Sequence, residues 1–158
     1  MKIGVLSDTH SQQLPRQMLN DFKKVDLIIH AGDFCTKDVL KALAGIKEVK
    51  GVYGNMDEPD LRRLLPRRQI VQCASFQVGV FHGEGAAKFI LDSVRREFKG
   101  IPVDAIIFGH SHQVMNEVID DVLYFNPGSP TDVVAPFRSY GILEVGKTIS
   151  GKIIKVPR

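Results

Sequence analysis

The sequence has no tryptophan, only two cysteines and no apolar run long enough to cross a membrane. Cys35 and Cys73 are isolated, so they form neither a CxxC pair nor a disulfide framework, which fits a reducing compartment. The first apolar run begins directly after Met1-Lys2 and leaves no room for a secretory signal. These absences predict a cytoplasmic protein without a membrane anchor.

The sequence also lacks a large excess of charge of one sign. Lysine and arginine number 21 against 18 aspartates and glutamates, which gives a net charge of +3. A protein that neutralises many phosphates needs a stronger basic bias, so we expect no stable nucleic-acid complex. With 158 residues, 44% of them hydrophobic, the chain is long enough to bury its own core, and we expect residues 1–158 to form a single domain.

Apolar periodicity predicts an α/β protein. Strands are expected over 2–7, 26–31, 48–53, 68–74, 76–81 and 103–108, and helices over 14–24, 37–44 and 86–98, with a loop or short helical turn over 59–66. Thr36 is the expected N-cap of the second helix, and Gly45 lies just past its end. Four shorter strands are expected over 114–119, 122–126, 139–145 and 148–156. Alternating elements followed by a β-rich end predict two packed sheets with helices outside.

Side chains that can bind metal ions follow most of the apolar runs. They are Asp8 and His10, Asp33, Asn55 and Asp57, His82, and His110 and His112. Ligand sites of open α/β sheets gather at the carboxyl ends of the strands, so we expect these side chains to meet at one rim. His30 lies inside a strand and is expected to be packed rather than to bind a metal.

Five motifs in order resemble the calcineurin-like metallophosphoesterase superfamily. They are Asp8-x-His10, Gly32-Asp33, Gly54-Asn55-x-Asp57, His82-Gly83 and Gly109-His110-Ser111-His112. The short length, Cys35-Thr36-Lys37 and Asn126-Pro127-Gly128-Ser129 narrow the resemblance to the small bacterial and archaeal phosphodiesterase branch, which is related to the retromer small subunit. The resemblance covers residues 1 to about 145. It implies a four-layer αββα sandwich of two mixed sheets.

The resemblance also implies a dinuclear metal centre that hydrolyses phosphodiester bonds with a bridging hydroxide. Asp33 would bridge the two ions, with Asp8, His10 and His112 on one ion and Asn55, His82 and His110 on the other. Asp33, Asn55 and His82 are the expected catalytic residues. Two carboxylates and a hydroxide leave two dications with a net positive charge that attracts a phosphodiester anion. Imidazole and oxygen ligands suit Mn(II), the expected ion, and also Ni(II), Zn(II), Fe and Co(II).

Met56 departs from the pattern of the wider superfamily that this chain resembles. At this position the superfamily carries a histidine, which acts as a general acid near the leaving group. Methionine cannot donate a proton, and losing a general acid typically costs about 10²–10⁴-fold in rate. We therefore expect a slow enzyme that prefers good leaving groups and favours diesters over monoesters. Asp57 is expected to orient a ligating histidine. Ser129 is expected to support the His110–His112 loop, with direct substrate contact as the alternative.

Two other functions are consistent with the resemblance. A non-catalytic metal-binding scaffold like the retromer small subunit would not need the seven coordinating side chains that this chain retains. A nuclease would need additional DNA-binding segments. Arg62, Arg63, Arg67 and Arg68 either guide an anionic substrate or form a solvated face. The expected partner is a small phosphodiester substrate. A homo-oligomer, either a dimer or a tetramer, is expected only by analogy with the family.

Overall fold

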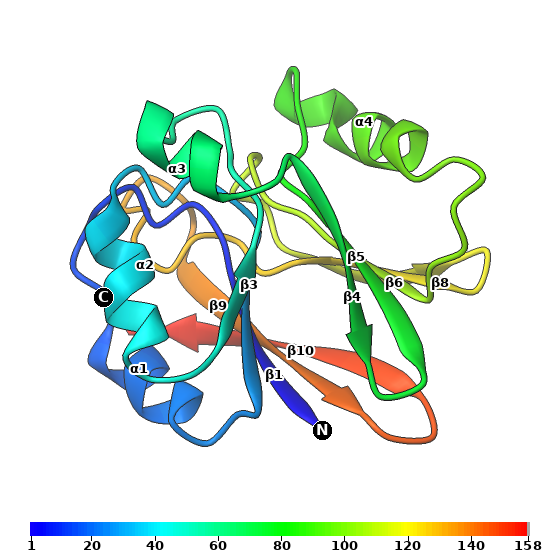
Figure 1. Ribbon diagram of the computed structural model, residues 1–158, viewed down its shortest axis with the longest axis horizontal. Coiled ribbons are helices and arrows are strands. Elements are labelled where there is room, and N and C mark those ends of the chain that lie inside the picture. The colour runs from blue at the N-terminus through cyan, green and yellow to red at the C-terminus, as the bar shows by residue number, and fades with distance from the viewer. Residues whose placement is uncertain (158) are drawn as a thin grey trace.

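The computed structural model describes residues 1–157, which fold into two five-stranded mixed sheets (Figure 1). The first sheet has the order β10 (Ile149–Val156), β9 (Arg138–Val145), β1 (Lys2–Leu6), β2 (Leu27–His30), β3 (Val49–Gly51). The second has the order β4 (Arg68–Cys73), β5 (Phe76–Phe81), β6 (Ala105–Ile107), β8 (Val122–Asn126), β7 (Met115–Ile119). The α/β class with two mixed sheets, predicted from the alternating and then β-rich pattern, is confirmed.

Four helices cover the outer faces of the sheets. They are α1 (Arg16–Phe22), α2 (Lys37–Ala44), α3 (Pro59–Leu64) and α4 (Ile90–Glu97). The helix predicted over 14–24 is shorter because Pro15 is extended at its N-cap. The helix predicted over 86–98 begins instead as a 3₁₀ turn, Ala87–Phe89, and α4 is no longer than α2. Thr36 occupies the N-cap of α2 but makes no side-chain cap bond, and its hydroxyl accepts a hydrogen bond from Ser11 instead.

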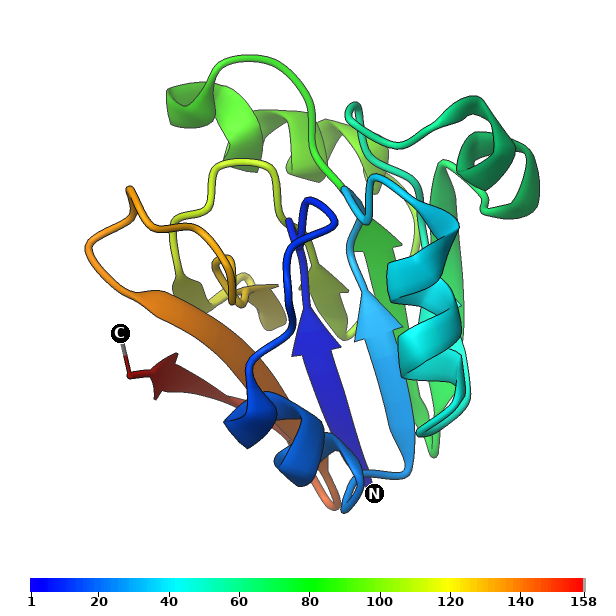
Figure 2. The same ribbon diagram turned by 90° about the vertical axis from the view of Figure 1, so that its left-hand side faces the viewer.

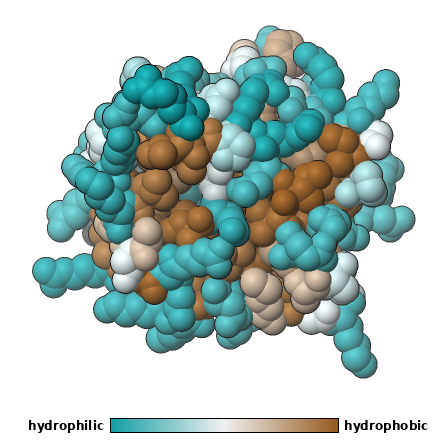
Figure 3. Space-filling view, in the orientation of Figure 1, coloured by the Kyte–Doolittle hydropathy of each residue, from teal (hydrophilic) through white to brown (hydrophobic). Residues whose placement is uncertain are grey.

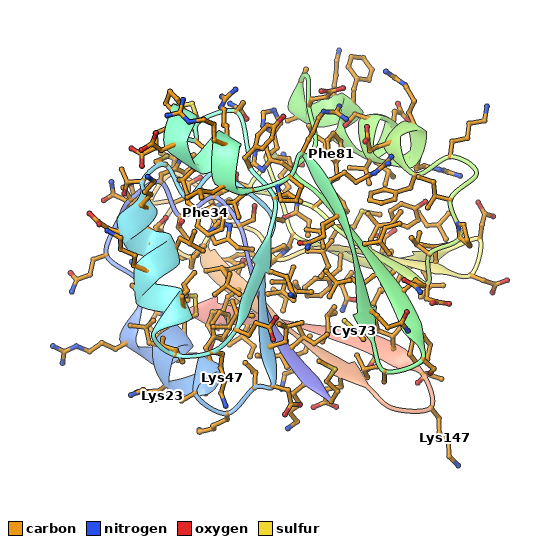
Figure 4. All side chains as sticks on the ribbon, viewed as in Figure 1. Lys23, Phe34, Lys47, Cys73, Phe81 and Lys147 are labelled. Atoms are coloured by element: carbon orange, nitrogen blue, oxygen red, sulfur yellow. The ribbon has the colours of Figure 1, made fainter. Side chains whose placement is uncertain are left out.

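The apolar side chains form three layers of core. Figure 4 labels one residue of each layer: Phe34 outside the first sheet, Cys73 between the sheets and Phe81 outside the second. The helices α1, α2 and α4 pack on these layers through buried apolar residues that are four positions apart. In α4 these residues are Ile90 and Val94. Figure 3 shows apolar residues reaching the surface mainly below α3 and below α4, with polar residues around them.

Parallel pairing brings the carboxyl ends of several strands to one end of the molecule. β1 pairs in parallel with β2 and β2 with β3, while β6 pairs in parallel with both β5 and β8. Figure 2 shows β1 and β2 pointing toward the same end, where the loops that follow them lie side by side. The hairpin predicted through Ala74-Ser75 joins β4 to β5, with Ala74 at a φ of 52°. Within residues 1–157, no helix is long and apolar enough to span a membrane.

Candidate metal centre

The seven predicted ligands lie together where the parallel strands end. The loop after β1 carries Asp8 and His10, the loops after β2 and β3 carry Asp33 and Asn55, and the loops after β5 and β6 carry His82, His110 and His112. Both sheets therefore contribute, and the donor atoms fall into two adjoining groups.

The first group consists of Asp8, His10 and His112, whose donor atoms lie within 4.8 Å of one another. The Nε2 atoms of His10 and His112 are 3.2 Å apart, and Asp8 Oδ1 lies 3.4 Å from His112 Nε2. The resemblance implied these three residues as ligands of one ion, which would also share the bridging carboxylate of Asp33.

The second group is built around His82. Its Nε2 atom lies 3.4 Å from Asp33 Oδ2 and 3.1 Å from Asn55 Oδ1. His110 joins through Nδ1, which is 3.2 Å from His82 Nε2 and 2.8 Å from Asn55 Oδ1. The residues implied for the second ion therefore surround one point.

Asp8 lies between the two groups. Its Oδ1 atom is 3.4 Å from His112 Nε2 and 3.9 Å from His82 Nε2, so the three atoms link one group to the other. Asp33 meets the second group, and its Oδ1 also accepts a 2.7 Å hydrogen bond from the Met56 N–H. The bridging role of Asp33 stays a prediction, and the geometry makes Asp8 a second candidate for it.

Each of the four histidines turns one nitrogen away from the centre toward a fixed partner. The outward partners are the Ala31 and Gly85 carbonyls for His82 and His110, the Asp132 carboxylate for His112, and the Cys35 sulfur for His10. Carbonyl and carboxylate oxygens can only accept, so the outward nitrogens of His82, His110 and His112 must carry a proton. When these three rings are neutral, their inward nitrogens present lone pairs, which is the arrangement that metal-binding histidines adopt.

These spacings fit metal ligation. Two ligand atoms bound to one ion at about 2.1 Å, with angles near 90–110°, lie about 3.0–3.4 Å apart. The distances between His10 and His112 and between His82 and His110 fall in that range, and His82 to Asn55 does as well. In their neutral form the facing nitrogens would repel one another unless a cation lay between them, so this donor set fits a pair of divalent ions.

The backbone at the centre adopts a conformation that side chains disfavour. Among the seven predicted ligands, φ is positive at Asp8, His10, Asp33, His110 and His112, with values between 46° and 66°. Such conformations cost on the order of 1 kcal/mol or more each and cluster at functional sites. The glycines of the motifs allow the close packing that goes with them, because a methyl group at Gly109 would overlap the Ser7 hydroxyl.

Burial and opposite charge act against each other on the ionisable groups of the centre. Burial favours a raised pKa for Asp33, but His82 and the Met56 N–H hold the pKa below its ordinary value. Burial likewise favours a lowered pKa for His82, but the carboxylates of Asp33 and Asp8 hold the pKa above its ordinary value. The hydrogen bond to Asp8, strengthened by Asp132, raises the pKa of His112 to about 9.

Asp57 does not orient a histidine, which corrects the sequence-based expectation. Its Oδ2 accepts hydrogen bonds from the N–H groups of Gly54 and Asp33, at 2.7 and 3.1 Å, and its Oδ1 accepts one from Cys35 at 2.7 Å. Asp57 therefore ties the loop after β3 to the loop after β2. Met56 extends outward beside it and is 57% exposed.

Ser129 and Asn126 share the supporting role that was expected of their turn. The Ser129 hydroxyl, only 1% exposed, donates to the Asp8 carbonyl at 2.7 Å, so it supports the loop after β1 and cannot reach a substrate. The Asn126 amide instead supports the His110–His112 loop, through the Gly109 carbonyl and the Ser111 hydroxyl. Gly128 has the positive φ, +72°, that its turn requires.

His30 is packed, as its place inside a strand predicted. Its ring stacks on Phe34 with centroids 3.5 Å apart, and Nδ1 accepts the Gly32 N–H. Nε2 therefore carries the proton and donates to the Thr9 hydroxyl at 3.1 Å. Burial holds the pKa of His30 well below its ordinary value, so the ring stays neutral.

All four arginines of the 62–68 segment have partners within the protein. Arg62 donates to the carbonyls of Asn55 and Asp57, and Arg63 pairs with Asp60. Arg67 and Arg68 both pair with Glu97. Arg62 therefore holds the Asn55 loop rather than standing free to guide a substrate.

The sequence interpretation missed Asp132. Its Oδ2 lies 2.6 Å from His112 Nδ1, which makes it the carboxylate that orients a histidine. No spacing marks Asp132, because it lies 20 residues beyond His112 in a loop without regular structure. Its flanking prolines, Pro130 and Pro136, predict only that a loop is present.

Comparison with known proteins identifies the family. The model of the calcineurin-like phosphoesterase superfamily domain matches residues 1–148. The chain belongs to this superfamily. A probable metallophosphoesterase of Methanocaldococcus jannaschii is 36% identical over 99% of this chain and 82% of its own length, and a phosphodiesterase of the same organism is 30% identical over 93% and 95%.

The phosphoesterase domain also has close structural neighbours. Vps29 from Chaetomium thermophilum superposes with a TM-score of 0.80 over 98% of this chain and 96% of its own, at 20% identity. At that identity the likeness extends to the fold alone, and it agrees with the sandwich of two mixed sheets. The family and the relatives together make this protein a hydrolase of phosphate esters whose family binds divalent metals.

Proposed function

We propose that this phosphoesterase is a phosphodiesterase that works through a dinuclear centre of divalent transition metals. The observation that carries the proposal is the convergence of seven donor side chains in two adjoining groups, with the outward nitrogens of His82, His110 and His112 held by oxygen acceptors. A phosphodiesterase among the relatives, 30% identical over nearly its whole length, supports the choice of substrate class.

The donor set assigns the residues to two ions. Asp8, His10 and His112 would hold one, and Asn55, His82 and His110 the other, with Asp33 or Asp8 shared. When bound, the two ions supply a hydroxide nucleophile at neutral pH and neutralise charge on the phosphoryl group. Four imidazoles favour Mn(II), Fe, Co(II), Ni(II) or Zn(II) over Mg²⁺ and Ca²⁺, and Mn(II) is our first choice.

The rest of the centre positions these ligands. Asp57 and Arg62 fix the turn that carries Asn55, and Ser129 fixes the backbone of Asp8. Met56 points outward without a proton to donate, so the leaving group must depart unassisted by this residue. The chemistry therefore favours diesters of acidic alcohols over alkyl monoesters.

The test compares hydrolysis of an aryl phosphodiester and the matching aryl monoester by metal-stripped protein. Mn(II), Ni(II), Zn(II) and Mg²⁺ are added back singly. Asp33→Ala removes a predicted ligand, and Asp38→Ala, at an exposed carboxylate of α2, is the matched control. We expect diesterase activity that needs a transition metal, is lost in Asp33→Ala and is retained in Asp38→Ala.

The same assay addresses the non-catalytic alternative. Protein that binds two ions but hydrolyses neither ester with any metal would contradict the phosphodiesterase proposal and support a metal-binding scaffold. Monoester turnover as fast as diester turnover would contradict the substrate class alone.

A further inference from the structure

A pocket of about 280 Å³ opens beside the metal centre. One wall is the loop that carries His110 and His112, and the opposite wall is the loop after β8 with Asp132, Val134 and Pro136. A substrate whose phosphoryl group meets the inward nitrogens of His110 and His112 would have this pocket directly next to it.

The outer wall is fixed to the metal centre. Asp132 accepts the Val134 N–H at 2.7 Å through Oδ1, and its Oδ2 meets His112 Nδ1 at 2.6 Å. The Ser129 hydroxyl accepts the N–H groups of Thr131 and Asp132, at 3.3 and 3.0 Å, and donates to the Asp8 carbonyl. The loop thus takes its position from the residues that also hold two predicted metal ligands.

The chemistry of the walls selects against charge. No lysine or arginine lines the pocket within the described residues, and the carboxylate of Asp132 is paired with His112. Val134, which is 89% exposed, presents apolar surface at the mouth. An arm that carries a second phosphate would find no lysine or arginine here, whereas an uncharged ring would cover apolar surface that is otherwise in water.

A larger cavity between α1 and α2, of about 840 Å³, is a weaker candidate for the same role. None of the seven predicted ligands lines it. Ser11 and Thr36, whose hydroxyls are joined by a 3.0 Å hydrogen bond, both line this cavity. The pocket beside His112 is instead lined by two of the predicted ligands themselves, His110 and His112.

We propose that this pocket is the subsite for an uncharged, ring-bearing alcohol arm of the phosphodiester substrate, and that Val134 determines which arms it accepts. The proposal rests on the proposed phosphodiesterase function and names its substrate class. Val134 selects by apolar contact and by keeping charge out of the pocket. A diester with two small arms gains nothing from this subsite.

The test uses binding of diphenyl phosphate and dimethyl phosphate to Zn(II)-loaded protein, measured by calorimetry. Val134→Asp and Val133→Asp add the same charge at adjacent exposed positions, of which only the first lines the pocket. We expect wild type to prefer diphenyl phosphate. Val134→Asp should weaken the binding of diphenyl phosphate at least tenfold, while the affinity for dimethyl phosphate changes less than threefold. Val133→Asp should leave the preference for diphenyl phosphate intact.

Three outcomes would overturn the subsite. They are equal binding of the two phosphates by wild type, equal loss in both variants, and an unchanged preference in Val134→Asp. Aryl diester hydrolysis is measured in parallel on the same preparations. Binding that follows the expected pattern without any hydrolysis would contradict the proposed function and leave the subsite in place, so the two failures are distinguishable.

Discussion

Replacing Asp132 by asparagine should weaken one metal-binding group and spare the other. The Asp132 carboxylate meets His112 Nδ1 at 2.6 Å, the length of a strong charge-assisted hydrogen bond. Asparagine keeps an oxygen that can accept the Val134 N–H but removes the negative charge behind the imidazole. Loss of such an outer partner typically costs about 10–100-fold in metal affinity, which is the change we expect for the group of Asp8, His10 and His112.

The assay is calorimetric titration of metal-stripped protein with Zn(II), which should resolve two binding events in wild type. Asp132→Asn should weaken one binding event by the expected factor and change the other less than threefold, because His82 and His110 have other outward partners. Asp38→Asn, at an exposed carboxylate of α2, is the control for a lost surface charge. Two unchanged events, or two events weakened alike, would refute the role assigned to Asp132.

Three further predictions test the surroundings of the centre. Met56→His places an imidazole at the rim and should raise aryl monoester hydrolysis by about tenfold or more, since a general acid typically contributes 10²–10⁴-fold; Met56→Gln, without a titratable group, should not raise it. Arg62→Gln frees the carbonyls of Asn55 and Asp57 and should weaken binding of one metal ion about tenfold, while Arg63→Gln should not. His30 is buried and neutral, so folding is opposed as pH falls below its ordinary pKa of about 6.5 and the unfolded chain takes up a proton. In urea unfolding with a chelator present, the stability of wild type relative to His30→Asn should fall by up to about 1.4 kcal/mol per pH unit between pH 6.5 and 5, and parallel stability curves would contradict this.

The ligands could be predicted from the sequence because each lies in a loop that follows a strand. Apolar runs such as Ile3–Leu6 and Val78–Phe81 mark strands by composition alone, and parallel strands end at one rim. Asp8 and His82 were therefore expected to meet, although 74 positions separate them in the chain (82 − 8 = 74).

The partners of the ligands could not be predicted in the same way. Asp57 was expected to face a histidine, but it accepts three backbone N–H groups, and this choice depends on the path of two loops. Asp132 reaches His112 only because the loop after β8 meets the loop after β6, which no periodicity encodes. Side chain to backbone contacts between loops leave little trace in hydrophobic patterning, whereas the strands that carry the loops leave a clear one.

The strained backbone of the centre is held by hydrogen bonds that continue the sheet beyond its strands. After β1 and β2 end, Asp8, His10 and Ser11 still donate backbone N–H groups to Gly32, Asp33 and Phe34, at 3.0–3.1 Å. In the second sheet, the Gly109 N–H donates to the His82 carbonyl in the same manner. The His110 N–H donates to the Asp8 carboxylate, and this hydrogen bond joins the second sheet to the first. Each such bond contributes about 1 kcal/mol, comparable to the cost of one left-handed residue, so the ladder can hold the ligands in place before an ion arrives. A centre built this way meets its ions with the ligand geometry already set, and the inward ring nitrogens and carboxylates, rather than the backbone, are what remains to be satisfied.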